Sequence, residues 1–504
     1  RHYNRSYAGG ASAYVPQNEF PWFSHSGDVE IIVKVPSGHE NRYLLHRHTL
    51  TRCSGFFEAS TSEPWSRAKE LPAPTLPSSI PGSELARIGE DSPSTTSNAV
   101  ARIGTPRKRW RYELDCGTGG DDIPMLVQKE EGESAASGTS ATNALISPSS
   151  IFGGATSSHI SASGARKSTN SQSSSRDYYR SSTNLSLTAA NLPPPTQNEQ
   201  DIIRDYDNLF RVMYNHPPVL DGINIADAYV QCKSLLTLAD QYDALTVVGP
   251  RVDHHLLQFQ SRLWKQIAKY PISYLRLGYL ARSKIIFQEA LIHVVGQWPA
   301  GERSLRNSMP EAVIDIIEDK VDELEETVAR VEGRLFRLNL TTRSGERVTP
   351  ATNYLDWLAV SLFRQWLADH TAPPPPPPPP TNSRGSVSAN TAPAATPSTA
   401  LAIPIIPPLS SLGRTYRTLG HPTGVSFLGH DECKRFLKMS PDMYSRENLR
   451  RFEKRIDELK ALAREVVRPL MGSSLELDLT GGSRAAEAIG YLTCTRVDDR
   501  DLPW

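Results

Sequence analysis

The chain has 504 residues, in which 55 Lys and Arg balance 55 Asp and Glu, so the formal net charge is zero. The length predicts two to four domains, and zero net charge argues against a general nucleic-acid-binding surface. The sequence contains no run of about 18 apolar residues, which argues against a membrane-spanning helix. Five scattered cysteines without a CxxC pair indicate a reducing compartment, cytoplasmic or nuclear, with no disulfide framework and no metal site.

The first twenty residues are polar and without periodicity, and we expect residues 1–20 to form a disordered tail. The chain begins without Met and without the apolar core of a signal peptide, as a fragment of a longer protein would. The next stretch, from Asp28 to Phe57, starts with β-branched residues that favour a strand, followed by a Ser37-Gly38 turn and a second apolar run. Apolar residues then recur every three or four positions, which predicts a β-hairpin leading into short helices.

Six residues of this stretch resemble the opening of a BTB/POZ domain, in which an Asp before the first strand is followed by His-Arg/Lys-x-x-Leu-x-x-x-Ser-x-x-Phe. The matching residues are Asp28, His46, Arg47, Leu50, Ser54 and Phe57. The resemblance implies an α+β fold that forms homodimers and docks protein partners. It also implies a partly buried ion pair between Asp28 and Arg47, in a groove near the dimer interface. Leu50 and Phe57 belong to the core in either interpretation, and a purely structural role for Asp28 and Arg47 is an equal alternative.

Two low-complexity segments interrupt this predicted domain. Residues 72–106 and 130–199 are rich in Ser, Thr, Pro, Ala and Gly and have no apolar period, so we expect both inserts to be disordered. Between them, Trp110, Tyr112 and Leu114 alternate with charged residues, which predicts a strand, and a second apolar run follows at residues 123–128.

Helical patterns from residue 201 to Val248 supply the helices that the opening hairpin lacks. We therefore expect one BTB/POZ domain over residues 21–248, similar to fungal BTB proteins with long Ser- and Pro-rich inserts. Cullin-binding members of the family often carry a hydrophobic-x-Glu element near the start of the central helix. The nearest match is Ile203-Arg204-Asp205, with Asp in place of Glu, which makes Ile203 and Asp205 the candidate contacts with a cullin.

Residues 250–370 predict an all-α domain with a heptad helix over residues 314–338. Its a and d positions are Ile314, Ile317, Val321, Leu324, Val328, Val331, Leu335 and Leu338. This helix could pair with another chain as a coiled coil, but apolar helices flank it on both sides. We therefore favour packing within its own bundle.

Eight prolines, Pro373–Pro380, predict a polyproline II segment within a linker over residues 371–410. It suits a profilin, SH3 or WW partner and suits a spacer equally well. The last region, residues 411–504, contains a predicted amphipathic helix at about residues 446–467.

No catalytic constellation stands out, and no HExxH, GxSxG or Walker motif is present. We expect a protein-interaction protein without a cofactor, which acts either as a substrate adaptor of a cullin-type ubiquitin ligase or as a scaffold or transcription-associated regulator. An enzyme whose site is assembled from distant residues is a remote alternative.

Overall fold

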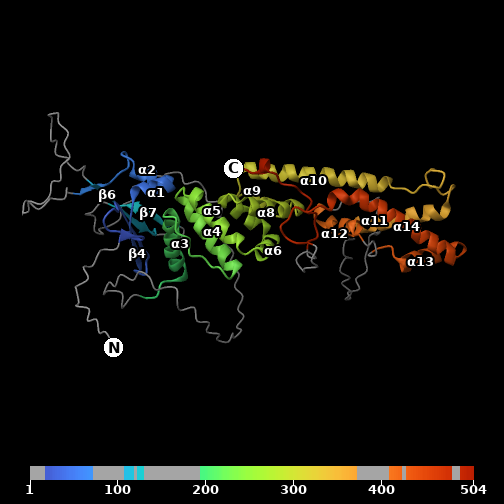
Figure 1. Ribbon diagram of the computed structural model, residues 1–504, viewed down its shortest axis with the longest axis horizontal. Coiled ribbons are helices and arrows are strands. Elements are labelled where there is room, and N and C mark those ends of the chain that lie inside the picture. The colour runs from blue at the N-terminus through green and yellow to red at the C-terminus, as the bar shows by residue number, and fades with distance from the viewer. Residues whose placement is uncertain are drawn as a thin grey trace, which may run out of the picture. The chain divides into compact units, whose positions relative to one another are not determined.

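The computed structural model describes residues 18–71, 107–117, 122–129, 193–371, 408–422, 427–479 and 489–504. The chain forms two compact units, Arg1–Gln258 and Phe259–Trp504 (Figure 1). The first unit combines a sheet with helices and the second is mostly helical, so the expected class, an α+β unit followed by an α-helical one, is confirmed.

The sheet of the first unit contains the predicted hairpin and the predicted third strand, which lies parallel to the first strand of the hairpin. Its order is β1-β2-β4-β3-β6-β5, with β7 also paired to β6. The register places Val29 beside Leu45 on one side and beside Trp110 on the other. The strands are β1 (Asn18–Glu19), β2 (Trp22–Phe23), β3 (Val29–Lys34), β4 (Glu40–Leu45), β5 (Lys69–Leu71), β6 (Arg107–Asp115) and β7 (Met125–Gln128).

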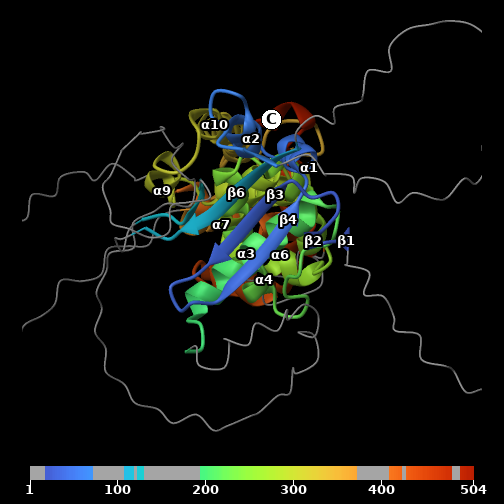
Figure 2. The same ribbon diagram turned by 90° about the vertical axis from the view of Figure 1, so that its left-hand side faces the viewer.

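One face of this sheet packs on helices. Figure 2 views the sheet from its opposite face, where β4, β3 and β6 lie in front of α3 and α4. The helices of this unit are α1 (Arg47–Cys53), α2 (Gly55–Thr61), α3 (Gln197–Met213), α4 (Ile225–Gln241) and α5 (Leu245–Leu257). The hydroxyl of Tyr242 accepts the backbone N–H of Leu126 at 2.8 Å and lies 2.8 Å from that of Tyr206, which links β7, α3 and the end of α4.

Three expected boundaries of the first unit are wrong. Asn18 and Glu19, placed in the tail, form β1. The second insert was expected to reach residue 199, but α3 begins at Gln197 because Thr196 and Glu199 form a capping box. The domain was expected to end at Val248, but α5 continues through Pro250 to Leu257, because Val248 and Val252 are fully buried. Residues 1–17, 72–106 and 130–192 lie outside the described residues.

The second unit contains nine helices among the described residues. They are α6 (Ser261–Lys269), α7 (Pro271–Ala281), α8 (Lys284–Gly296), α9 (Glu302–Arg306), α10 (Glu311–Arg337), α11 (Tyr354–Thr371), α12 (Leu409–Gly420), α13 (His430–Lys438) and α14 (Arg446–Val467). The helix expected at about residues 446–467 coincides with α14, which packs against α10, α11 and α12. The C-terminal region is therefore part of this unit and not a separate one.

The heptad helix is α10, and its predicted apolar stripe faces the interior of its own unit. All eight a and d residues are at most 9% exposed, and α10 packs against α8 and α14. Only Leu338 lies beyond the last turn, as the C-cap. This arrangement supports packing within the bundle over pairing with another chain.

The predicted linker is shorter than expected at its C-terminal end, since α12 begins at Leu409. Residues 372–407, with Pro373–Pro380, lie outside the described residues. Of the described helices, none is both long enough and apolar enough to cross a membrane.

Candidate interaction surface

Three of the six BTB-like residues hold the helices of the first unit together. Leu50 and Phe57 are fully buried. Ser54 is the N-cap of α2, where its Oγ accepts the N–H of Phe57 at 3.4 Å and donates to the carbonyl oxygen of Tyr242 at 2.5 Å. These residues therefore build the fold and are not available to a partner.

Asp28 and Arg47 lie together, but they do not form the expected ion pair. Asp28 Oδ1 accepts the backbone N–H of Arg47 at 2.6 Å, at the start of α1. The Arg47 guanidinium lies 5.2 Å from the Trp110 ring centre, and its Nε donates to Thr61 Oγ1 at 3.1 Å. The physical reason is that the first turn of a helix leaves N–H groups without partners, and a nearby carboxylate satisfies one of them.

His46 connects three segments of the first unit. Its backbone N–H donates to the Tyr214 hydroxyl at 2.6 Å, and its ring nitrogens lie 2.9 Å from that hydroxyl and 2.8 Å from Ser26 Oγ. Burial raises the pKa of Tyr214 to about 12, so that its hydroxyl stays protonated. His46 thus fixes the segment before β3 to the end of α3.

The proposed cullin-contact residues are arranged differently from the expectation. Asp205 is only 4% exposed and points into the unit, where its carboxylate pairs with Arg204 Nη2 at 2.9 Å and accepts a hydrogen bond from Ser234 Oγ of α4. Burial raises the pKa of Asp205. Ile203 remains partly exposed, but Asp205 is committed to the α3–α4 contact and cannot meet a partner in this conformation.

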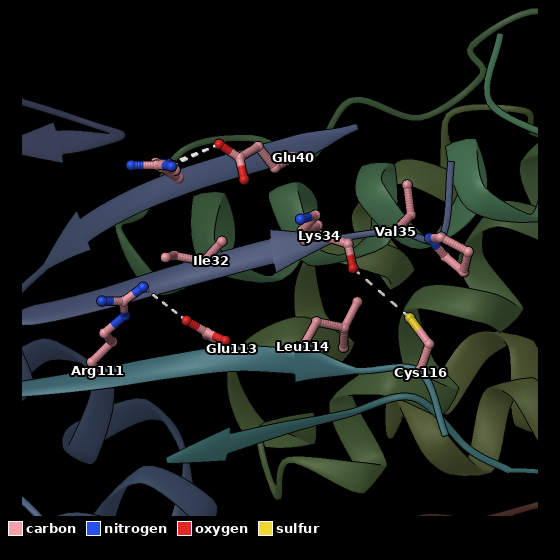
Figure 3. A pocket seen from close by; sticks show the side chains of 10 residues that line it. Ile32, Lys34, Val35, Glu40, Arg111, Glu113, Leu114 and Cys116 are labelled. Atoms are coloured by element: carbon pink, nitrogen blue, oxygen red, sulfur yellow. Dashed lines mark hydrogen bonds and ion pairs between the residues drawn. The ribbon is translucent and has the colours of Figure 1, made fainter. Parts of the chain in front are cut away.

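The face of the sheet turned away from α3 and α4, here called the outer face, carries a groove that the sequence analysis did not identify. β3 and β6 pair as far as Ile32 and Glu113 and then separate, leaving a hollow of about 500 Å³ (Figure 3). Beyond the last pair, the thiol of Cys116 still donates to the carbonyl oxygen of Lys34 at 3.8 Å. The lining residues are Ile32, Lys34, Val35, Pro36, Glu40, Arg42, Arg111, Glu113, Leu114 and Cys116.

The charges of the groove are paired along each strand and not across strands. Arg42 lies 2.8 Å from Glu40 on β4, and Arg111 lies 2.8 Å from Glu113 on β6. Lys34, on the strand between them, is exposed and has no carboxylate partner among the described residues. The groove is therefore lined by three cations and two carboxylates, and its one unpaired charge, on Lys34, is positive.

Beside the groove, β7 presents apolar side chains to solvent. Met125 and Val127 are 37% and 38% exposed, and Ile123, which precedes the strand at the same parity, is 69% exposed. The register sets Met125 beside Asp115 and Val127 beside Glu113, so this apolar strip continues the outer face. Exposed apolar groups gathered on one face are typical of interaction surfaces.

The signal for this surface was present in the sequence as alternation. Glu30, Ile32 and Lys34 occupy every second position of β3 and share one face, on which Ile32 is only 6% exposed, while the fully buried Val29, Ile31 and Val33 share the other. Such alternation identifies an outer face, but the hollow depends on where β3 and β6 separate, and no local pattern records that separation.

Within the described part of the chain, no group of three or more His, Cys, Asp or Glu side chains is placed to hold a metal ion. Comparison with protein-family models, with curated proteins and with solved structures found no match to this chain.

Proposed function

We propose that the chain is a protein-interaction protein whose N-terminal unit associates with a second copy of itself and docks partner proteins, as the BTB/POZ domains that it resembles do. The second unit serves as a further binding surface or as a spacer. In this proposal the chain acts as a scaffold or regulator and not as an enzyme.

The observation that carries the proposal is the outer face of the sheet. One face of the sheet is closed by α3 and α4, while the other combines a hollow of about 500 Å³ with the apolar strip of Ile123, Met125 and Val127. Isolated exposed apolar residues are ordinary, but a strip beside a charged hollow supports a docking role. The six BTB-like residues add support by resemblance.

The role of cullin adaptor has less support. The nearest match to the cullin-binding element of the family is Ile203-Arg204-Asp205, with Asp in place of Glu, and Asp205 is buried against Arg204 and Ser234. Mixing the chain with a purified cullin of the kind that binds BTB proteins, followed by size-exclusion chromatography, separates the two roles. If the chain acts as a scaffold, it should elute apart from the cullin. A stable complex of the chain with the cullin would instead support the role of adaptor.

Self-association is tested on the full chain by light scattering across a range of concentrations. We expect twice the mass of one chain. The double variant Met125→Glu, Val127→Glu tests whether the apolar strip forms the contact between the two copies. Both side chains are partly exposed, so the fold should tolerate the charges. A monomer at every concentration of the unmodified chain would contradict self-association.

A further inference from the structure

We propose that the groove on the outer face binds an acidic, extended peptide segment of a partner protein. One aliphatic side chain of the peptide sits in the hollow, and a carboxylate two residues along the peptide pairs with Lys34. This inference rests on the proposed function and names the chemistry of the partner.

The charge of the groove selects the sign of the partner. Glu40 and Glu113 each already have an arginine on the same strand, at 2.8 Å in both cases. Lys34 is exposed and has no such partner among the described residues. A carboxylate entering the groove supplies the partner that Lys34 lacks, whereas an added cation would meet two glutamates that are already neutralised.

The shape of the groove selects an extended segment with an aliphatic side chain. Ile32, Val35, Pro36 and Leu114 line the hollow between the charged pairs, as Figure 3 shows for the three that it labels, Ile32, Val35 and Leu114. A hollow of about 500 Å³ accommodates a few side chains of such a segment. In an extended chain, side chains two residues apart share one face, so an aliphatic residue and an acidic residue at that spacing reach the groove together.

The experiment measures fluorescence anisotropy of dye-labelled peptides added to the full chain. The probes are Gly-Glu-Leu-Glu-Glu-Leu-Gly, the same peptide with every Glu replaced by Lys, and the same peptide with every Glu replaced by Ser. A single-stranded oligonucleotide of similar charge tests for general attraction of anions. We expect the acidic peptide to bind, with an affinity that falls as salt is added, and the other three probes to bind at least about fivefold more weakly.

The variants test Lys34 itself. Lys34→Glu reverses the unpaired charge of the groove and should weaken the acidic peptide by about fivefold or more. Lys108→Glu is the matched control, because Lys108 is also exposed and changes the net charge equally but does not line the groove. It should change the affinity by less than about twofold. Circular dichroism verifies that both variants are folded, and Lys34→Gln replaces Lys34→Glu if the latter is not.

Three results would overturn the inference: equal binding of acidic and basic peptides or none at all, equal binding of the oligonucleotide, and an equal loss in both lysine variants. The peptide measurement does not depend on the mass of the assembly. A monomer that binds the acidic peptide would therefore refute self-association alone, and a dimer that does not bind it would refute this inference alone.

Discussion

At the scale of single residues, the contact between Asp28 and Arg47 shows how a backbone group can compete with a side chain for a carboxylate. The Asp28 carboxylate accepts the N–H of Arg47 at 2.6 Å, where α1 begins and where no side chain of the helix itself caps the first turn. The Arg47 guanidinium lies over the face of the Trp110 ring. The carboxylate therefore acts as a remote cap, and the arginine as a cover for an aromatic ring.

This assignment predicts that Asp28→Ala destabilises the first unit by about 1 kcal/mol, the usual cost of a lost cap. Asp28→Asn should cost less, because its side-chain oxygen still accepts the hydrogen bond. Arg47→Gln should lower stability by about 0.5–1 kcal/mol through the lost contact with Trp110. Urea unfolding of the three variants measures these differences. An Asp28→Asn variant as unstable as Asp28→Ala would point to the charge, and hence to an ion pair.

The residues predicted from periodicity were placed correctly, whereas the roles predicted from chemistry for Arg47 and Asp205 differ from those in the structure. Leu50 and Phe57 are fully buried, because apolar spacing reports directly on burial. Asp205 was expected at a contact surface and lies inside, because Ser234 and Arg204 offer hydrogen bonds that no spacing reveals. A polar residue can be buried wherever the fold supplies partners, and those partners are distant in sequence.

At the scale of elements, the start of α3 depends on Glu199. Its carboxylate accepts the backbone N–H groups of Thr196 and Ser37, at 2.8 and 2.7 Å. The same residue thus completes a capping box and fastens the turn of the β3–β4 hairpin to α3. The hydrogen bonds from Thr196 and Ser37 lower the pKa of Glu199.

A lowered carboxyl pKa makes stability depend on pH in one direction. The unfolded chain has the ordinary value of about 4.3, so the contribution of Glu199 is fully present above that pH and is lost as pH falls through the lower folded pKa. We expect Glu199→Gln to be less stable than the unmodified chain near pH 7 and the difference to shrink as the pH falls from about 5 to 3. Urea midpoints across this range test the expectation, with the exposed Glu63→Gln as control. A difference independent of pH would contradict it.

The strands missed in the sequence are those with too few residues for a period. β1 and β2 have two residues each and β5 has three, and β1 pairs with β2, β2 with β4 and β5 with β6. The capping box at Thr196, by contrast, could have been found, because a Thr followed three positions later by Glu is a local signal. Length therefore separates the predicted strands from the missed ones, whereas the helices α12 and α13, of 12 and 9 residues, were missed although each is long enough for a helical period.

At the scale of the whole molecule, the first unit is assembled from segments far apart in the chain. β3 pairs with β6, about 80 residues further along, and Ser54 bonds to Tyr242, 188 residues away. The heptad pattern in the second unit gave the length of α10 and its buried face. The pattern could not identify α8 and α14 as the helices that α10 packs against, because apolar residues at this spacing pack equally well in a helical bundle and in a coiled coil.

The division into two units predicts that a core substitution in one leaves the other folded. Leu324 is 4% exposed within α10, so Leu324→Lys buries a charge without a partner and should destabilise the second unit by at least about 3 kcal/mol. Phe336→Lys is the matched control on the same helix, since Phe336 is 73% exposed and should change stability by no more than about 0.5 kcal/mol. Calorimetry should show the transition of the second unit lowered or lost in Leu324→Lys and that of the first unit unchanged. If Leu324 instead paired two chains, light scattering would show a folded monomer in place of a dimer. That outcome would refute the assignment of α10 to its own bundle.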